Sequence, residues 1–215
     1  MYSASIEKLS RHFIPENFVI TNWESLAGYF QLLNDRSLSD VTALENWLRD
    51  LSELEAVISE DACWRQIKMT CDTESKELEE RFNYFMLEIQ PHIQVWSDKL
   101  NRKLVDCPFT SSLDAKKYFT FLRSIRKQID LFREPNIPLI AALSVLQQQF
   151  GVIAGKMTVT VNGNEYTLQQ AAKFLESHDR NKREEVYHKI QQRRLQDTAA
   201  LNNLYNQLVQ KRNEE

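Results

Sequence analysis

Apolar residues recur at the period of an α-helix along most of this chain. Between Tyr118 and Phe132, five large apolar residues follow at spacings of four, three, four and three, which places them on one side of a helix. The charged residues of this stretch fall away from that stripe. Two prolines follow, the second being Pro138, and each lacks an N–H and disfavours helical geometry in the preceding residue. The pattern predicts a helix, a sharp corner, and an apolar helix from Pro138 to Gly151 or Gly155.

Capping residues predict where the earlier helices begin. Residues 1–20 show no clear period and are expected to form an irregular lead-in. Thr21 and Glu24 have the T-x-x-E form of a capping box, so a short helix is expected from there to about residue 33. Ser39 or Asp40 is expected to cap the next helix, in which apolar residues follow the helical period up to Ile58.

Two long helices are predicted further along the chain. The first is expected over residues 73–105, with a bend at Pro91. The helix that contains Tyr118 should return antiparallel to it, because the connection is short. The second opens at Asp179 or Asn181 and continues for about 30 residues, or about 45 Å at 1.5 Å per residue.

One segment reads as strand. Val159 and Val161 alternate with threonines, and Asn162-Gly163 supplies the residues that tolerate positive φ in a tight turn. A β-hairpin is therefore predicted over about 157–167, and it must lie against helices or another sheet because an isolated hairpin is marginal in water. Thr167 and Gln170 form a second capping box. The predicted fold class is all-α: one helical domain over residues 1–215, a multi-helix array with two long helices and one β-hairpin.

Composition narrows the class of protein. The chain has 215 residues with four glycines and five prolines, so turns are scarce and helices should be long. The net charge of −3 gives no field that favours nucleic acid. Three cysteines without a C-x-x-C pair suggest reduced thiols in a cytoplasmic protein. The N-terminus lacks the apolar core of a signal peptide, and the longest apolar run, Ile137 to Leu146, is too short to cross a bilayer. No membrane and no nucleic-acid partner is expected.

Candidate metal and catalytic residues are few. None of the four histidines belongs to an H-E-x-x-H motif, which zinc peptidases use to aim two imidazoles at one metal. Glu185 and His188 have the E-x-x-H form of di-iron bundles but lack a second copy; the alternative is a surface pair on a helix. Glu88 and His92 lie one turn apart without a third ligand. No catalytic, metal or substrate-binding residue is assigned. Cys63 and Cys71 can share a helical face but lie too far apart along it for a disulfide. All four tryptophans are expected in the core: Trp23, Trp47, Trp64 and Trp96.

A basic face on the helix around Tyr118 has two interpretations. It consists of Arg123, Arg126, Lys127 and Arg133. It is either a site for an acidic peptide or phosphate, or a solvated face that Asp130 and Glu134 balance, with Arg126 and Asp130 as an i,i+4 pair.

Several stretches, in their order and spacing, resemble the N-terminal helical part of the oligoendopeptidase F group of zinc metallopeptidases, which are of the thimet oligopeptidase type. The resemblance covers roughly residues 18–212. The stretches that carry it are residues 47–54, 122–127, 131–134, 137–139, 157–159 with Gly163, 167–171, 179–187, 193–197 and 201–205.

The resemblance implies the N-terminal portion of an enzyme that hydrolyses short peptides with a zinc-bound water and a glutamate base. In that family the N-terminal helices form one wall of a deep channel over the metal. This portion is then expected to enclose substrate and to be inactive alone. The zinc and the H-E-x-x-H motif would lie in a C-terminal catalytic domain of the same chain, its expected partner.

A different class stays open: a free-standing helical interaction module. The polar middle and abrupt end of the last helix fit either a frayed terminus or a helix cut from a longer protein. A severed peptidase should expose an apolar patch beside the hairpin and the last helix, whereas a module should be polar there.

Overall fold

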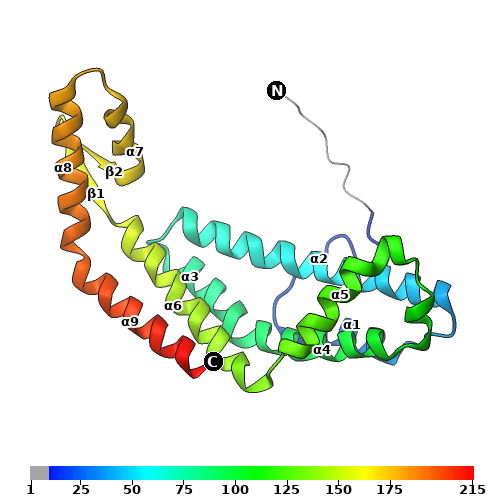
Figure 1. Ribbon diagram of the computed structural model, residues 1–215. Coiled ribbons are helices and arrows are strands. Elements are labelled where there is room, and N and C mark those ends of the chain that lie inside the picture. The colour runs from blue at the N-terminus through cyan, green and yellow to red at the C-terminus, as the bar shows by residue number, and fades with distance from the viewer. Residues whose placement is uncertain (1–9) are drawn as a thin grey trace. The chain divides into compact units, whose positions relative to one another are not determined.

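The computed structural model describes residues 10–215, and these form α-helices and one two-stranded antiparallel sheet (Figure 1). The predicted all-α class with one β-hairpin is confirmed. The described residues group into two compact units. Unit 1 comprises residues 10–66 and 87–137, and unit 2 comprises residues 67–86 and 138–215. The single domain expected over 1–215 stays a prediction.

Unit 1 is built around the helix that follows Asp40. Trp47 is fully buried, and its Nε1 donates a hydrogen bond to the carbonyl oxygen of Leu33 at 2.8 Å. Burying an aromatic ring with its polar atom satisfied stabilises a core without a desolvation cost. The unit contains α1 (Trp23–Asp35), the first 26 residues of α2 (Val41–Cys71), α4 (Gln90–Asp106), α5 (Ala115–Leu131) and two 3₁₀ turns (Pro108–Ser112 and Glu134–Asn136).

Polar side chains fix the helix ends of unit 1. The predicted cap of α1 was one residue off: Asn22, not Thr21, accepts the N–H of Ser25 at 3.0 Å, because the helix begins at Trp23. Asp40 caps α2 by accepting the N–H of Ala43 at 2.8 Å. That hydrogen bond is the main cause that lowers the pKa of Asp40, as expected for a carboxylate at a helix N-terminus.

The carbonyl end of α1 is closed by a lysine from α4. The Lys103 ammonium donates to the carbonyl oxygens of Leu33, Asn34 and Arg36 at 2.9, 2.6 and 2.6 Å. These carbonyls lie at the end of the helix, where no intrahelical N–H reaches most of them. Burial is the largest influence on Lys103 and lowers its pKa. The half-buried ammonium of Lys103 therefore links α4 to α1.

The helix predicted over residues 73–105 with a bend at Pro91 is instead divided into two α-helices by a π-helical turn. Ser75 caps α3 (Lys76–Tyr84), a π-helical turn follows at Phe85–Ile89, and α4 begins just before Pro91. Proline has no N–H to donate to the preceding turn, and π-turns are one way a helix absorbs such a defect.

The predicted stripe on α5 is confirmed. Leu122 and Ile125 are buried, and Tyr118, Ile129 and Phe132 are half-buried. Asp114 caps the helix by accepting the N–H of Lys116.

Unit 2 holds the hairpin. Strand β1 (Thr158–Val161) pairs with β2 (Asn164–Thr167), with Val161 opposite Asn164. Asn162 and Gly163 have φ of 53° and 80°, the turn that the sequence predicted. The remaining elements are α3, α6 (Ile137–Gly155, all but its first residue), α7 (Leu168–Ala172), a 3₁₀ turn (Lys173–Glu176), α8 (Arg180–Gln196) and α9 (Thr198–Glu214).

The hairpin rests on α7 and α8, as predicted (Figure 1). Val159, Val161, Ala171, Val186 and Ile190 form a small buried cluster between these elements. The capping box at the start of α7 is present, with both of its hydrogen bonds. The hairpin is stable because its apolar face is covered by helices.

The long last helix was predicted as continuous, and this was wrong. It breaks at Asp197, which has φ −95° and ψ 9° and whose N–H bonds to the carbonyl oxygen of Leu195. Asp197 and Thr198 are both poor helix formers. The Asp197 carboxylate pairs with Arg193 one turn earlier, which holds the bend.

Two further expectations need correction. Trp64 on α2 is 53% exposed and not part of the core. The apolar run from Ile137 to Leu146 was expected to be too short to cross a bilayer, but the helix that contains it is longer than the run and ends at Gly155, one of its two predicted ends. In the described part of the chain, Glu134–Gly155 is the one helical segment long and apolar enough to span a membrane by length and composition, and 17% of that window is buried.

Candidate functional site

The side chains that the sequence offered as possible metal ligands each contact a neighbouring side chain and do not converge on a common point. Glu185 pairs with Lys189 at 2.5 Å, while His188 faces Glu184 at 3.9 Å. His92 stacks on Trp23 at 4.9 Å between ring centroids. Among residues 10–215, no group of three His, Cys, Asp or Glu side chains could hold a metal ion. The E-x-x-H pattern of α8 is thus a row of surface pairs.

The cysteines carry no visible site either. Cys63 and Cys71 are exposed and free, and Cys107 is buried and free. Since the sequence spacing excluded a disulfide between the first two, their free state agrees with that reasoning.

A cavity of about 790 Å³ lies within unit 1, along one face of α2. The volume is in the range of ligand-binding clefts. The exposed Ser52 and Ala56 have small side chains that leave space above the helix. The other lining residues come from α2, from the segment before it and from the start of α5: Ser10, Arg11, His12, Glu45, Leu48, Arg49, Glu53, Val57, Glu60, Lys117 and Tyr118.

One carboxylate fixes a wall of this cavity. Glu53 Oε1 accepts backbone N–H groups of His12, Phe13 and Ile14 at 3.1, 2.9 and 2.7 Å, and Oε2 accepts that of His12 at 2.9 Å. Burial would raise the pKa of Glu53, but these hydrogen bonds outweigh it and hold the pKa below its ordinary value. Glu53 thereby attaches the segment before α1 to α2.

The other charges around the cavity are mostly paired. Arg11 meets Glu60 at 3.3 Å, and Lys117 meets Glu45 at 3.6 Å, while the Tyr118 hydroxyl donates to Glu45 at 3.0 Å. This cavity was not predicted from the sequence. No local signal marks it, because its walls come from three segments far apart in the chain.

The basic face on α5 is present. Phe119, Arg123, Arg126 and Lys127 are all exposed. The expected pair between Arg126 and Asp130 is not formed. Arg133 instead turns to backbone, donating to the carbonyl oxygens of Asp130 and Phe132.

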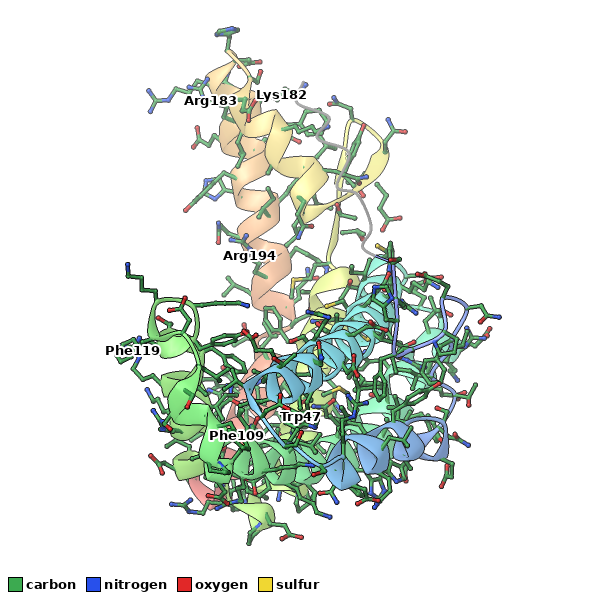
Figure 2. All side chains as sticks on the ribbon, turned by 90° about the vertical axis from the view of Figure 1, so that its right-hand side faces the viewer. Trp47, Phe109, Phe119, Lys182, Arg183 and Arg194 are labelled. Atoms are coloured by element: carbon green, nitrogen blue, oxygen red, sulfur yellow. The ribbon has the colours of Figure 1, made fainter. Side chains whose placement is uncertain are left out.

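Unit 2 exposes large apolar side chains on three helices. Phe150 on α6 is 57% exposed, Leu195 on α8 is 70% exposed and Tyr205 on α9 is 66% exposed. Tyr187 and Val209 add to this surface. Figure 2 shows α8 with its cations Lys182, Arg183 and Arg194 labelled. The Arg183 guanidinium donates hydrogen bonds to the carbonyl oxygens of Ser177 and His178.

Comparison with models of known protein families finds a match for this chain. The sequence pattern of the Peptidase M3 N-terminal domain matches residues 13–132, more than half of the chain. No curated protein matches the chain.

Solved structures with this fold include three peptidases. A protein named an oligoendopeptidase F is 20% identical with a TM-score of 0.82, over 94% of this chain and 36% of its own. PZ peptidase A with an inhibitor is 21% identical with a TM-score of 0.80, over 89% and 34%. An oligoendopeptidase F from Bacillus anthracis str. Ames is 17% identical with a TM-score of 0.82, over 94% and 38%. The chain therefore spans about a third of the length of these proteins, and the likeness is one of fold.

Proposed function

The chain belongs to the Peptidase M3 N-terminal domain family, and on this premise we propose that it is the substrate-enclosing part of a zinc-dependent oligopeptidase. Its role is to form a wall around short peptides while another part of the protein carries the chemistry. A cytoplasmic location, expected from the cysteine content, belongs to the same proposal.

The observation that carries the proposal is the poor burial of α6. The segment Glu134–Gly155 is apolar around its circumference, yet 17% of its most apolar window is buried. A helix that is apolar on all sides is normally covered on all sides. Large apolar side chains are also exposed on each of three helices of unit 2: Phe150 on α6, Leu195 on α8 and Tyr205 on α9. Surfaces of this kind mark interaction sites, and the catalytic domain of the same chain is the partner we propose.

The residues of this chain do not fit a zinc site. The sequence has no H-E-x-x-H, and the described residues contain no group of three candidate ligands. No step of peptide hydrolysis is therefore assigned to them. Their contribution is enclosure, which raises specificity by excluding substrates that cannot enter.

Activity assays test the division of labour. The 215-residue chain alone should not cleave a fluorogenic short peptide, with or without zinc. A second check is the coding sequence downstream of Glu215, which should encode H-E-x-x-H on a predicted helix. Zinc-dependent cleavage by this chain alone, or a stop codon directly after Glu215, contradicts the proposal.

A docking assay tests the apolar surface. If the downstream part is produced separately, mixing it with this chain should restore cleavage. Leu195→Asp should weaken the restored activity about tenfold or more, since it puts a charge into an apolar contact. Leu32→Asp is the matched control, because Leu32 is 58% exposed on α1 of unit 1. Equal loss in both variants, or none in either, argues against docking through unit 2.

The alternative of a free-standing interaction module predicts a polar exterior beside the hairpin and the last helix. Leu195 on α8 and Tyr205 on α9 lie in the segment predicted as the last helix, and their exposure favours the peptidase part instead.

A further inference from the structure

The outward face of α5 combines one exposed aromatic ring with several cations. Phe119, Arg123 and Arg126 lie at i, i+4 and i+7, so they share one side of the helix. Lys116 and Lys127 flank them, and all five side chains are exposed. We call these five residues the Phe119 face. Figure 2 shows Phe119 on the outer side of α5, while Trp47 lies inside unit 1.

The cations of the Phe119 face have no carboxylate partner among residues 10–215. Elsewhere, arginines pair with an acid one turn earlier: Arg65 with Asp61 at 2.6 Å and Arg102 with Asp98 at 2.7 Å. On α5 the only acid one turn from an arginine is Asp130, which lies four residues after Arg126. An i,i+4 ion pair with the base before the acid is weaker than one with the acid before the base. The charge balance expected of a merely solvated face is therefore missing.

The ring of Phe119 is not explained by the packing of unit 1. It is 63% exposed, although it lies only three residues before the buried Leu122 and so borders the buried stripe of α5. The Arg123 guanidinium lies 5.8 Å from the ring centroid. A guanidinium over an aromatic ring leaves its edge free to bind a carboxylate. The ring and the Arg123 guanidinium thus lie against each other, and Arg126 lies on the same side of the helix.

We propose that the Phe119 face binds an acidic protein segment that carries an apolar side chain. Its carboxylates would pair with Arg123 and Arg126, whose planar forks suit bidentate binding. Its apolar side chain would cover Phe119. This inference does not rest on the peptidase role of the chain.

Other anionic partners fit this face less well. A membrane surface requires several apolar side chains on one face besides basic ones. Among the five residues of this face only Phe119 is apolar, and the exposed Leu131 lies beyond it at the end of α5. The net charge of −3 disfavours nucleic acid.

Peptide binding to the whole chain tests the proposal. The probe is a labelled hexapeptide of five glutamates and one leucine, and its control has glutamines in place of the glutamates. We expect the acidic peptide to bind, to shift backbone amide NMR signals on α5, and to weaken as salt rises. The glutamine peptide should bind at least about fivefold more weakly.

Variants distinguish binding at the Phe119 face from non-specific electrostatic attraction of the peptide to other cations of the chain. Arg123→Gln combined with Arg126→Gln should weaken acidic-peptide binding about tenfold, at about two- to fivefold for each exposed ion pair. Phe119→Ser should weaken it about three- to tenfold through lost apolar contact. Arg194→Gln, an exposed arginine of α8 without a carboxylate partner among the described residues, should leave it within about twofold. None of these exposed side chains is part of a core, so the variants should fold.

Three results would overturn the proposal. One is no binding of the acidic peptide up to about 5 mM. Another is binding that the α5 variants leave unchanged. The third is tighter binding to phosphatidylserine vesicles or to duplex DNA than to the peptide, with the same dependence on Arg123 and Arg126.

Discussion

Replacement of Glu53 by glutamine tests how the wall of the unit 1 cavity is held. The carboxylate accepts three successive backbone N–H groups, from His12, Phe13 and Ile14, at 2.7 to 3.1 Å. Glutamine keeps the shape and one acceptor oxygen, but it removes the charge and turns the other oxygen into a donor. Ile14 is 2% exposed, so its N–H cannot turn to water instead.

The expected loss of stability follows from these bonds. Hydrogen bonds to a charged group are worth about 1.5–3 kcal/mol and neutral ones about 0.5–1.5 kcal/mol. Because Glu53 is only half-buried and one oxygen can still accept, Glu53→Gln should lower the free energy of unfolding by about 1–3 kcal/mol. Hydrogen exchange at Phe13 and Ile14 should accelerate in the same variant, since these amides lose their acceptor.

The pH dependence has a definite sign. The folded pKa of Glu53 lies below its ordinary value of 4.5, so the unfolded chain takes up this proton at higher pH than the folded chain. The stabilisation is therefore fully present above the ordinary pKa and is lost as pH falls through the folded pKa. The difference between the native chain and Glu53→Gln should be constant at neutral pH and shrink towards pH 3.

Urea unfolding at several pH values provides the measurement, and Glu60→Gln provides the control. Glu60 holds the same segment through Arg11, but its side chain is 52% exposed, so its loss should cost no more than about 1 kcal/mol. Equal effects of the two variants at pH 7 would refute the reasoning. So would a Glu53→Gln effect that persists unchanged at pH 3.

Three further predictions concern other parts of the fold. Lys103→Met keeps the apolar stem but leaves three carbonyls at the end of α1 without their donor, so it should lower the free energy of unfolding by about 2–3 kcal/mol in urea titrations; an unchanged midpoint contradicts this role. Gly163→Ala forces a side chain onto a residue with φ 80° and should lower the free energy of unfolding by about 1–2 kcal/mol. The control Gly28→Ala, in open space on α1, should raise it by about 0.5–1 kcal/mol. Calorimetry that finds the same sign for both variants contradicts the assignment of the turn. Addition of EDTA should leave the melting temperature of the chain unchanged, because its described residues offer no three-ligand group; a fall in that temperature would point to a metal that this chain binds.

Local signals accounted for much of the fold. The stripe on α5, the cap of α2 and the turn at Asn162-Gly163 each depend on residues close in sequence. The stripe and the turn formed as predicted, and of the two predicted caps, Ser39 and Asp40, the structure has Asp40. Capping and turn geometry are decided by a few neighbouring backbone groups. These features can therefore be placed from the sequence without knowledge of the packing.

The errors have physical causes of two kinds. Where two residues could start or continue a helix, local preference was too close to decide: Asn22 displaced Thr21, and the chain bent at Asp197 although the helical pattern ran through it. Where the outcome depended on distant segments, no local signal existed. The cavity along α2 needs the lead-in residues and the start of α5, and Trp64 is exposed because no described segment covers that side of α2.

The helix α6 shows where a sequence pattern stops being informative and a structure begins to be. Its residues are apolar with so little periodicity that no buried face can be predicted. From its length and composition alone, such a helix could equally belong to a protein core or span a membrane. The structure adds that Ala141 and Leu143 are buried while Phe150 is exposed, so the described residues cover only part of its circumference. Helices α8 and α9 of the same unit also expose large apolar side chains, Leu195 and Tyr205. A single spanning helix would not require that, but a docking surface for a second body of protein would. The distribution of exposure over three helices therefore supports a protein partner over a bilayer.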